Sequence, residues 1–356
     1  MTEAVRRIHV SASRSYDVLV APGLLDRCGK LVSDVAAPCG VALVSDSNVA
    51  PLYAARVRAS LERAGYRVFE HVFPAGERSK NLTVWGEVVS FLAENRLGRG
   101  DVVAALGGGV VGDLAGFAAA VYQRGVRYVQ IPTTLLAAVD SSVGGKTAVD
   151  LPQGKNLAGA FHQPSLVICD TDTLSTLPAV QIRSGSAEAI KCAVLSSPEL
   201  FSRMEMESIP DMLDDVIAAC VSYKRDVVAE DEFDTGARAK LNLGHTIGHA
   251  AEACGGYALT HGEAVSIGLA VIARAAARRG ICPAEDAARI VALLEKNGLP
   301  VATGLDADTL YAAALSDKKR QGGRLKLIVP ERIGACRIET IDAADLPGWM
   351  RDGGIT

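Results

Sequence analysis

The chain is 356 residues long, carries a formal net charge of −4 at pH 7, and is 49% hydrophobic. This length exceeds what one hydrophobic core usually organises, so we expect about two domains. The hydrophobic content excludes a disordered chain, and the slight acidity argues against a nucleic-acid binder, whose domain normally carries a basic excess. The sequence has no run of eighteen apolar residues, which argues against a membrane span.

The first half of the chain alternates strand and helix patterns. Short apolar runs typical of buried parallel strands are separated by segments with helical periodicity. We expect strands at 17–20, 40–46, 66–73, 101–106, 128–131 and 165–169, and helices at 50–64, 81–95 and 114–121. This alternation predicts a doubly wound, Rossmann-like α/β domain.

The pattern becomes mainly helical after Asp172. We expect helices at 181–207, 211–230, 238–253, 263–279 and 284–297, and then a small hairpin of strands 324–329 and 335–339. A turn-rich segment at 172–180 marks the boundary, which gives an α/β domain over residues 1–174 and a helical domain over residues 175–356. A cleft between two such domains is the default place for an active site.

Cysteine usage and the first residues of the chain indicate the compartment. The eight cysteines are scattered without a CxxC pair, and the sequence starts without the apolar core of a signal peptide. We therefore expect reduced thiols and a cytoplasmic location.

A glycine-rich loop, Gly107-Gly-Gly-Val-Val-Gly-Asp113, follows one of the expected strands and opens a helix. It satisfies the G-x-G-x-x-G pattern, in which a diphosphate reaches backbone N–H groups at a helix N-terminus. The acidic residue expected about twenty positions later is missing, so the usual Rossmann order is not met. Asp46, at the end of an earlier strand, is a candidate for ribose binding, and a helix N-cap is its alternative role.

Several polar residues lie in glycine-rich or turn-rich contexts that suit an anion. The segment Asp140-Ser-Ser-Val-Gly-Gly-Lys-Thr147 is not a Walker A motif, because aspartate stands where that motif needs glycine. Gly154-Lys-Asn156 adds a second lysine and an amide, and Glu188 and Lys191 share a helix face at i, i+3. Each basic residue alone is more often a solvated surface charge, and its context is what favours a site.

Three of the six histidines lie between 245 and 261, in Asn242-Leu-Gly-His-Thr-Ile-Gly-His249 and His261-Gly-Glu263. Imidazole is the commonest protein metal ligand, so this clustering favours a metal site, a proton relay or both. Glycines at 244 and 248 allow something to approach the backbone closely. The i, i+4 spacing of His245 and His249 is that of a helical zinc pair, and a helix whose histidines only cap and pack is the alternative.

Taken in chain order, these motifs resemble the 3-dehydroquinate synthase family of sugar phosphate cyclases over about residues 15–345. The set that carries the resemblance is 107–113, Pro132-Thr-Thr134, 139–147, 154–156, Ala187-Glu-Ala-Ile-Lys191, 238–249, His261-Gly-Glu-Ala-Val265 and Asp317-Lys-Lys319. The long histidine motif and the segment 140–147 are specific. The glycine loop is not, because related metal-dependent polyol dehydrogenases carry similar loops.

The resemblance implies a fold, two cofactors and an assembly. These are an N-terminal NAD-binding α/β domain, a C-terminal helical domain that binds one zinc or cobalt ion, and a homodimer. It assigns the metal to Glu188, His245 and His261, and it leaves His249 as a proton relay beside the substrate. Three protein ligands leave room for substrate oxygens, as a catalytic metal requires.

The resemblance also implies a reaction. The substrate is 3-deoxy-D-arabino-heptulosonate 7-phosphate, whose C5 hydroxyl is oxidised by bound NAD so that the C6 proton becomes acidic. Phosphate is eliminated, the ketone is reduced by the same cofactor, and an intramolecular aldol step closes 3-dehydroquinate, an intermediate of the shikimate pathway. The enzyme would be a carbon–oxygen lyase.

Site residues are carried over by position. The implied catalytic residues are His249, Lys146, Lys191, Asn156 and Asp140. The implied substrate-binding residues are Arg124 from the other subunit, Lys146, Asn156, Lys191, Lys224, Arg238, Asn242, His249 and Lys318. The implied NAD-binding residues are Asp46, Asn48, Glu77, Lys80, Gly107, Gly108, Gly109, Val110, Gly112, Asp113, Thr133, Thr134, Lys146, Lys155, Thr173, Thr176 and Leu177.

Other functions remain open at the level of sequence. A cyclase acting on an amino-substituted relative of the substrate, a metal- and NAD-dependent glycerol-type dehydrogenase, and a catalytically silent nucleotide sensor all fit part of the pattern. Arg238 and Asn242 weigh against cyclases whose substrates lack a carboxylate. One departure from the family pattern is Ser186, which stands before Ala187 and Glu188 where the family usually has a bulky apolar residue.

Overall fold

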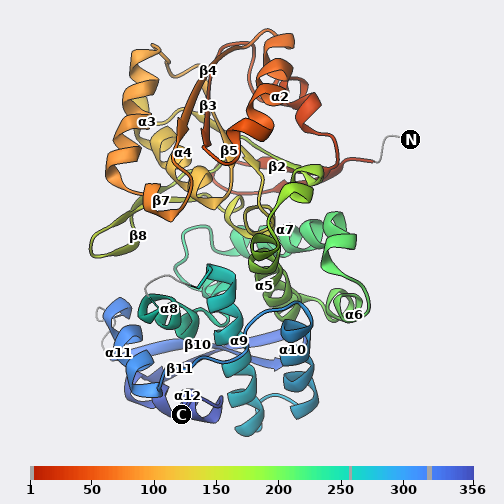
Figure 1. Cartoon of the computed structure of the whole chain (residues 1–356), viewed down its shortest axis with the longest axis vertical. Coiled ribbons are helices and arrows are strands. Elements are labelled where there is room, and N and C mark those ends of the chain that lie inside the picture. Colours follow the sequence, from red (N-terminus) through yellow and green to blue (C-terminus); the bar gives the residue numbers. More distant parts are fainter. Residues whose placement is uncertain (1–3, 256–258, 319–322) are drawn as a thin grey trace. The chain divides into compact units, whose positions relative to one another are not determined.

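The structure is a computed structural model that describes residues 4–255, 259–318 and 323–356, with only the backbone described for 316–318. The chain divides into two compact units (Figure 1). The first comprises Met1–Leu177 and Lys224–Phe233, and the second comprises Pro178–Tyr223 and Asp234–Thr356.

The first unit is built on a seven-stranded sheet. Its strands, in order across the sheet, are β1 (Arg6–Val10), β2 (Tyr16–Ala21), β9 (Leu166–Asp170), β6 (Arg127–Pro132), β5 (Val102–Gly107), β3 (Gly40–Asp46) and β4 (Arg67–Phe73). All neighbours are parallel except β1, which pairs antiparallel with β2. The central strands are buried on both faces, as their continuous apolar sequences predict.

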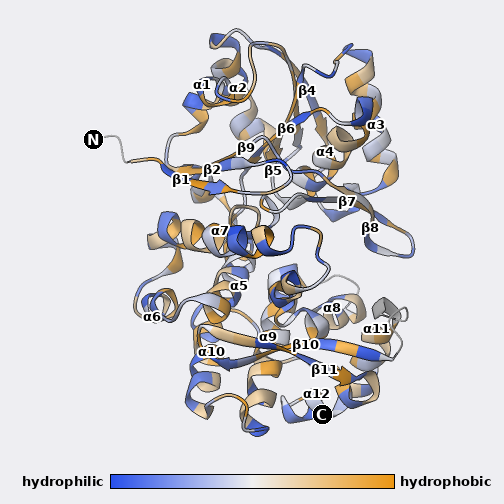
Figure 2. Cartoon of the chain, turned by 180° about the vertical axis from the view of Figure 1, so that it is seen from behind, coloured by the Kyte–Doolittle hydropathy of each residue, from blue (hydrophilic) through white to orange (hydrophobic). Residues whose placement is uncertain are grey.

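Helices cover both faces of this sheet. One face packs α1 (Cys28–Val32) and α2 (Ala50–Arg63) against alternate residues such as Leu43 and Ala104. The other face packs α3 (Leu82–Glu94) and α4 (Gly109–Val121) against the residues between them, such as Val44 and Ala105. The helices carry polar residues on their outer sides, as the hydropathy colours show (Figure 2). A hairpin of β7 (Lys146–Leu151) and β8 (Gly154–Phe161) extends this unit.

The second unit is mainly helical. Its elements are α5 (Ala179–Ser196), α6 (Pro198–Met206), the first part of α7 (Leu213–Glu230), the 3-10 helix η7 (Ala237–Asn242), α8 (His245–Cys254), α9 (His261–Arg278), α10 (Ala284–Lys296), α11 (Ala307–Lys318), the antiparallel pair β10 (Arg324–Arg332) and β11 (Ala335–Asp342), and α12 (Leu346–Asp352). Helix α9 is buried along most of its length and packs against α5, α8, α10 and α12.

The fold class expected from the sequence, a parallel α/β sheet followed by a helical part, is confirmed, while several element boundaries were wrong. The helix expected at 181–207 is broken at Ser197, whose hydroxyl caps α6. Ser197 also precedes Pro198, and the residue before a proline disfavours the helical conformation. The helix expected at 238–253 is broken at Gly244, whose φ of 79° is left-handed. We expected one domain boundary at 174/175; the two compact units separate after Leu177, and Lys224–Phe233 belongs to the first unit.

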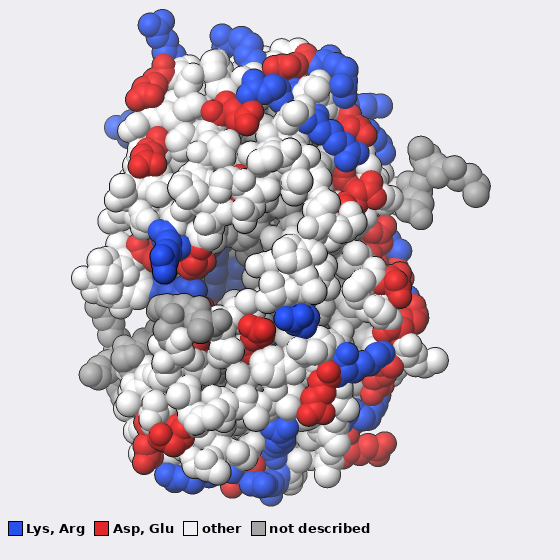
Figure 3. Space-filling model, in the orientation of Figure 1, with Lys and Arg blue, Asp and Glu red and all other residues white. Residues whose placement is uncertain are grey.

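Three features of the chain concern its surface charge, its helices and its cysteines. On the face drawn in Figure 3, basic and acidic side chains are interspersed. Within the part of the chain that the structure describes, no helix is long and apolar enough to cross a membrane. The eight cysteines, all at described positions, form no disulfide.

Candidate nucleotide and metal sites

Most residues expected to bind NAD follow the carboxyl ends of parallel strands, which share one edge of the sheet, while Lys146 and Lys155 lie on the β7–β8 hairpin. Asp46 and Asn48 lie at the end of β3, Glu77 and Lys80 after β4, Gly107 to Asp113 at the end of β5 and the start of α4, Thr133 and Thr134 after β6, and Thr173, Thr176 and Leu177 after β9. Helix α2, which follows β3, and helix α4, which follows β5, cover opposite faces. The edge between β3 and β5 is therefore a topological switch point, where open α/β sheets bind ligands.

The glycine loop presents the N-terminus of α4 at this edge. Gly108 is the N-cap residue of the 13-residue helix. A Cβ at Gly107 would lie 2.4 Å from Val111 Cγ2 and 2.7 Å from its Cβ, so this position needs glycine for the first turn of α4 to form here, while a Cβ at Gly112 would only displace the end of the Gln130 side chain. The first backbone N–H groups of the helix are then positioned to bind an anion.

Two further observations concern the fit of a nucleotide at this edge. Thr133 Oγ1 is buried and has no hydrogen-bond partner among the described residues, which fits an atom awaiting a ligand. Asp46 Oδ1 accepts hydrogen bonds from the backbone N–H of Asn48 at 2.8 Å and of Val49 at 3.0 Å. Asp46 is therefore not the N-cap of α2, which is Val49, but it closes the turn that precedes the helix, and these bonds use only one of its carboxylate oxygens.

Charged residues predicted for the site form specific pairs. Lys80 is 5% exposed, and its Nζ lies 2.5 Å from Asp113 Oδ2 and 2.6 Å from Asn156 Oδ1. Burial would lower the pKa of Lys80, but the carboxylates of Asp113 and Glu77 outweigh it and raise that pKa. Lys155 pairs with Glu77 at 2.9 Å. These contacts tie the glycine loop and the β7–β8 hairpin together around one buried ammonium.

The remaining predicted residues of the first unit lie in three places. Lys224 is buried, and its Nζ donates to the Asp140 carboxylate at 2.7 Å and to the Asp140 carbonyl at 2.6 Å. Lys146 is exposed at the start of β7. Arg124 is exposed in a turn where it and Gln123 both have positive φ.

In the second unit, side chains that could bind a metal ion gather where three helices meet; we call Glu188, His245 and His261 the metal-type cluster. Glu188 and Lys191 lie on α5, His245 is the first residue of α8, and His261 is the first residue of α9. Helix α9 begins at His261 because Thr260 and Glu263 form a capping box. Each of these side chains therefore has its position set by the start or the buried face of a helix.

Glycines allow these helices to approach each other closely. A Cβ at Gly248 of α8 would lie 2.6 Å from the Ala264 carbonyl oxygen of α9, and one at Gly268 of α9 would lie 1.9 Å from the Gly244 carbonyl oxygen. The space expected beside the imidazoles is thus filled by the backbone of a neighbouring helix.

The ligand atoms converge on one point. His261 Nε2 lies 3.4 Å and His245 Nε2 lies 3.6 Å from Glu188 Oε1. One ligand atom from each of Glu188, His245 and His261 lies within 4.8 Å of the others, and the same holds for a second group of His249, Glu252 and His261. The ring centroids of His245 and His249 are 5.1 Å apart, so the relay candidate adjoins the first group and belongs to the second.

The electrostatics of the first group suit a divalent cation. Burial would raise the pKa of Glu188, but Lys191 and the two histidines outweigh it and hold that pKa well below its ordinary value. Burial and Lys191 hold the pKa of His245 well below its ordinary value, which leaves a neutral imidazole. Burial would lower the pKa of His261, but Glu188 and Glu252 raise it to about 9.

The contacts of Glu188 also fit a metal ligand. Its carboxylate is buried and forms an ion pair with Lys191, but neither oxygen accepts a hydrogen bond of normal geometry from a described residue. The contacts to the two imidazoles are too long for hydrogen bonds. A bound cation would be coordinated by the Glu188 oxygens and would displace the proton from His261.

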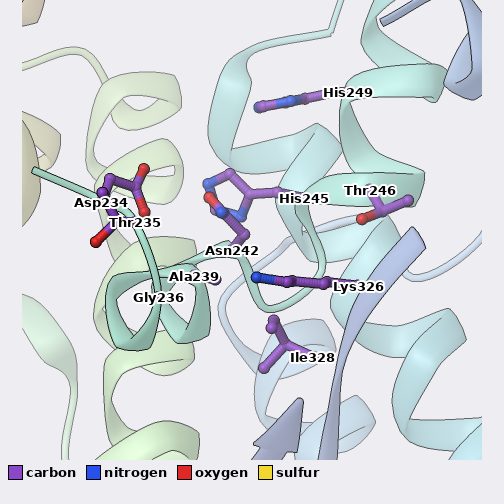
Figure 4. A pocket seen from close by; sticks show the side chains of 10 residues that line it. All are labelled: Asp234, Thr235, Gly236, Ala239, Asn242, His245, Thr246, His249, Lys326 and Ile328. Atoms are coloured by element: carbon purple, nitrogen blue, oxygen red, sulfur yellow. The ribbon is translucent and has the colours of Figure 1, made fainter. Parts of the chain in front are cut away.

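A cavity of about 300 Å³ opens beside this cluster (Figure 4). It is lined by Asp234, Thr235, Gly236, Ala239, Asn242, His245, Thr246, His249, Lys326 and Ile328. Of the predicted residues, Asn242, His245 and His249 reach it, while Arg238 is buried on η7 and the side chain of Lys318 lies outside the described residues. Lys326, whose side chain points into the cavity from β10, was not among the expected residues, although the sequence around it alternates polar and apolar positions.

Comparisons with known proteins match the chain over almost its full length. Residues 70–184 match the 3-dehydroquinate synthase N-terminal family model, and residues 185–320 match the C-terminal one. Curated 3-dehydroquinate synthases from Enterococcus faecalis and Caulobacter vibrioides are 44% and 45% identical over 96% of this chain, covering 98% and 96% of those proteins. The chain belongs to the 3-dehydroquinate synthase family.

Solved structures place this member of the 3-dehydroquinate synthase family among sugar phosphate cyclases. A 2-deoxy-scyllo-inosose synthase complexed with carbaglucose-6-phosphate, NAD⁺ and Co²⁺ is 26% identical, with a TM-score of 0.86 over 98% of this chain and 100% of that one. The 2-epi-5-epi-valiolone synthase of Streptomyces hygroscopicus, with NAD⁺ and Zn²⁺ bound, is 28% identical, with a TM-score of 0.87 over 98% of this chain and 99% of that one. A glycerol dehydrogenase from Schizosaccharomyces pombe, 17% identical with a TM-score of 0.67 over 99% of this chain and 91% of that one, shares the fold.

Proposed function

We propose that this chain converts 3-deoxy-D-arabino-heptulosonate 7-phosphate to 3-dehydroquinate and inorganic phosphate. The observation that carries the proposal is the Glu188–His245–His261 group, which adjoins His249 and a polar cavity in a chain that matches its family over almost its full length. The nucleotide and metal named for the two cyclase structures support the same cofactors here.

The residues of the chain suit both cofactors. NAD would be held at the sheet edge by the N-terminus of α4 and by the residues that follow β3, β4, β6 and β9, and zinc or cobalt would be held by Glu188, His245 and His261. When bound, NAD supplies reversible oxidation of a substrate hydroxyl, and the ion supplies Lewis acidity that favours the alkoxide and polarises the ketone.

His249 is the residue that we propose moves a proton. It is exposed, lines the cavity, adjoins His245, and is not a member of the Glu188–His245–His261 group. An imidazole titrates near neutral pH, so it can accept the proton of the C5 hydroxyl and return it later in the cycle.

Cations and amides would bind the two anionic ends of the substrate. We assign the phosphate to Lys146, Asn156, Asn242 and Lys318, with Arg124 acting from the second subunit of a homodimer. We assign the carboxylate to Lys224 and to Arg238, whose fork can bind it in a bidentate manner. Asp140 holds Lys224 in place, which supports a positioning role for that carboxylate.

The reaction class and setting follow from this chemistry. Phosphate elimination makes the enzyme a carbon–oxygen lyase of the shikimate pathway, which leads to aromatic amino acids. None of the eight cysteines, all at described positions, forms a disulfide, which supports a reducing, cytoplasmic location.

The direct test follows phosphate and NADH together. Purified enzyme supplied with NAD and the heptulosonate phosphate is expected to release one phosphate per substrate without accumulating NADH. A chelator should abolish phosphate release, and added Zn²⁺ or Co²⁺ should restore it. Stoichiometric formation of NADH without phosphate release would contradict the proposal and indicate a dehydrogenase instead.

A further inference from the structure

The imidazole of His261 lies between two carboxylates. Its Nε2 is 3.4 Å from Glu188 Oε1, and its Nδ1 is 3.7 Å from Glu252 Oε2. Glu252 lies on α8 and is only 5% exposed, so it does not face bulk water. Its position is set by the close packing of α8 on α9, where Gly248 contacts the backbone of Ala264.

This arrangement distinguishes the two ring nitrogens of His261. An imidazole that binds a metal through one nitrogen carries a proton on the other, and a carboxylate facing that N–H fixes the tautomer and the ring orientation. It also makes the imidazole a stronger electron donor to the metal. Glu188 stands on the Nε2 side, where His245 also points, whereas Glu252 stands on the Nδ1 side.

We propose that Glu252 is a positioning residue that orients His261 for metal binding. Its carboxylate faces the Nδ1–H of His261 and holds that proton on Nδ1, which leaves Nε2 free to bind a divalent cation together with Glu188 and His245. The inference rests on the metal assignment of the proposed function, and it adds a residue that the sequence motifs did not assign.

A direct ligand role for Glu252, with His249 and His261, is the competing arrangement, because those three also offer atoms within 4.8 Å of one another. Two features disfavour it. His249 is exposed, whereas Glu188 is buried and its oxygens accept no hydrogen bond from any residue that the structure describes. Occupying both groups would also require one neutral imidazole to lose its second proton and bridge two dications.

Metal affinity without substrate tests the proposal. Metal-free enzyme is titrated with Co²⁺ against a competing chelator, and both the dissociation constant and the visible Co²⁺ spectrum are recorded. We expect Glu252→Gln and Glu252→Ala to raise the Kd about 10- to 100-fold, the range typical for loss of such an outer-shell partner. The stoichiometry should remain one ion per chain, with altered Co²⁺ bands.

Glu205→Gln is the matched control. It removes a carboxylate charge in the same unit, breaking a 2.6 Å ion pair with Arg289, but lies outside both ligand groups. Its Co²⁺ affinity should equal that of the parent. Circular dichroism checks the folding of every variant, and Glu252→Asp, whose shorter side chain withdraws the oxygen from Nδ1, replaces any variant that does not fold.

Three outcomes would overturn the inference. These are an unchanged Kd in folded Glu252 variants, a parent chain that binds two ions where Glu252→Gln binds one, and a parent that binds none. Because the titration contains neither substrate nor NAD, it is separate from the proposed function. A chain with Glu252-dependent metal binding that released no phosphate would contradict the cyclase assignment alone.

Discussion

At the scale of single residues, Glu188 is the centre of the metal-type cluster. His245 and His249 have the spacing of a helical zinc pair, yet the contacts to Glu188 come from His245 and from His261, sixteen positions further along the chain. Sequence spacing alone cannot find such a group, because it reports neighbours on one helix and not the packing of three. The family resemblance identified the three residues, and their roles stay a proposal.

Lys80 gives a residue-scale prediction about stability. Replacing it by methionine would leave the largely buried carboxylate of Asp113 without its cation. Removal of one partner from a buried pair costs about 3 kcal/mol, which we expect as the loss in free energy of unfolding measured in urea.

Lys155→Met provides the control for Lys80→Met. Lys155 pairs with Glu77 at 2.9 Å, but both side chains are about a third exposed or more. A pair of this kind contributes less than about 1 kcal/mol. Equal destabilisation by the two substitutions would show that the buried Lys80–Asp113 pair contributes no more to the free energy of unfolding than the exposed Lys155–Glu77 pair.

At the scale of elements, close helix packing positions the metal-type cluster. A Cβ at Gly262, one residue into α9, would lie 2.1 Å from the Ser184 carbonyl oxygen of α5. Gly262 therefore sets the distance between the helices that carry His261 and Glu188. Neither motif nor periodicity indicates this contact, because it joins segments separated by 78 positions.

Gly262→Ala is expected to weaken metal binding as well as the fold. Backbone atoms have little room to move, so we expect about 1–3 kcal/mol of destabilisation, the usual cost of overpacking. The displaced helix should also lower Zn²⁺ content after dialysis. Gly304→Ala, at a position with nothing within 4 Å of the added Cβ, should change neither. Full metal retention in Gly262→Ala would argue against this packing role.

The elements themselves were predictable to different degrees. The buried parallel strands were found because they are short apolar runs bounded by turns. The charged β1 and the glycine-rich β7–β8 hairpin were missed because their residues lack a clear apolar alternation. The break before α6 had a signal in Ser197-Pro198, whereas the break at Gly244 lies inside the histidine motif.

At the scale of the whole molecule, each candidate site is formed by residues from distant segments of the chain. Apart from Lys146 and Lys155 on the β7–β8 hairpin, the residues expected to bind NAD come from the ends of five strands, and parallel topology places them on one sheet edge. The sequence predicted the α/β class but not the strand order. The return of Lys224–Phe233 to the first unit depends on contacts such as Lys224 with Asp140, which pattern analysis does not detect.

The central claim is that the chain separates metal binding from proton transfer, with Glu188, His245 and His261 doing the first and His249 the second. Metal content per chain and phosphate release, measured side by side in His261→Ala and His249→Ala, test it most directly. We predict that His261→Ala loses both the ion and the activity, whereas His249→Ala keeps one ion per chain and loses rate. Equal loss of metal from the two variants would contradict the account.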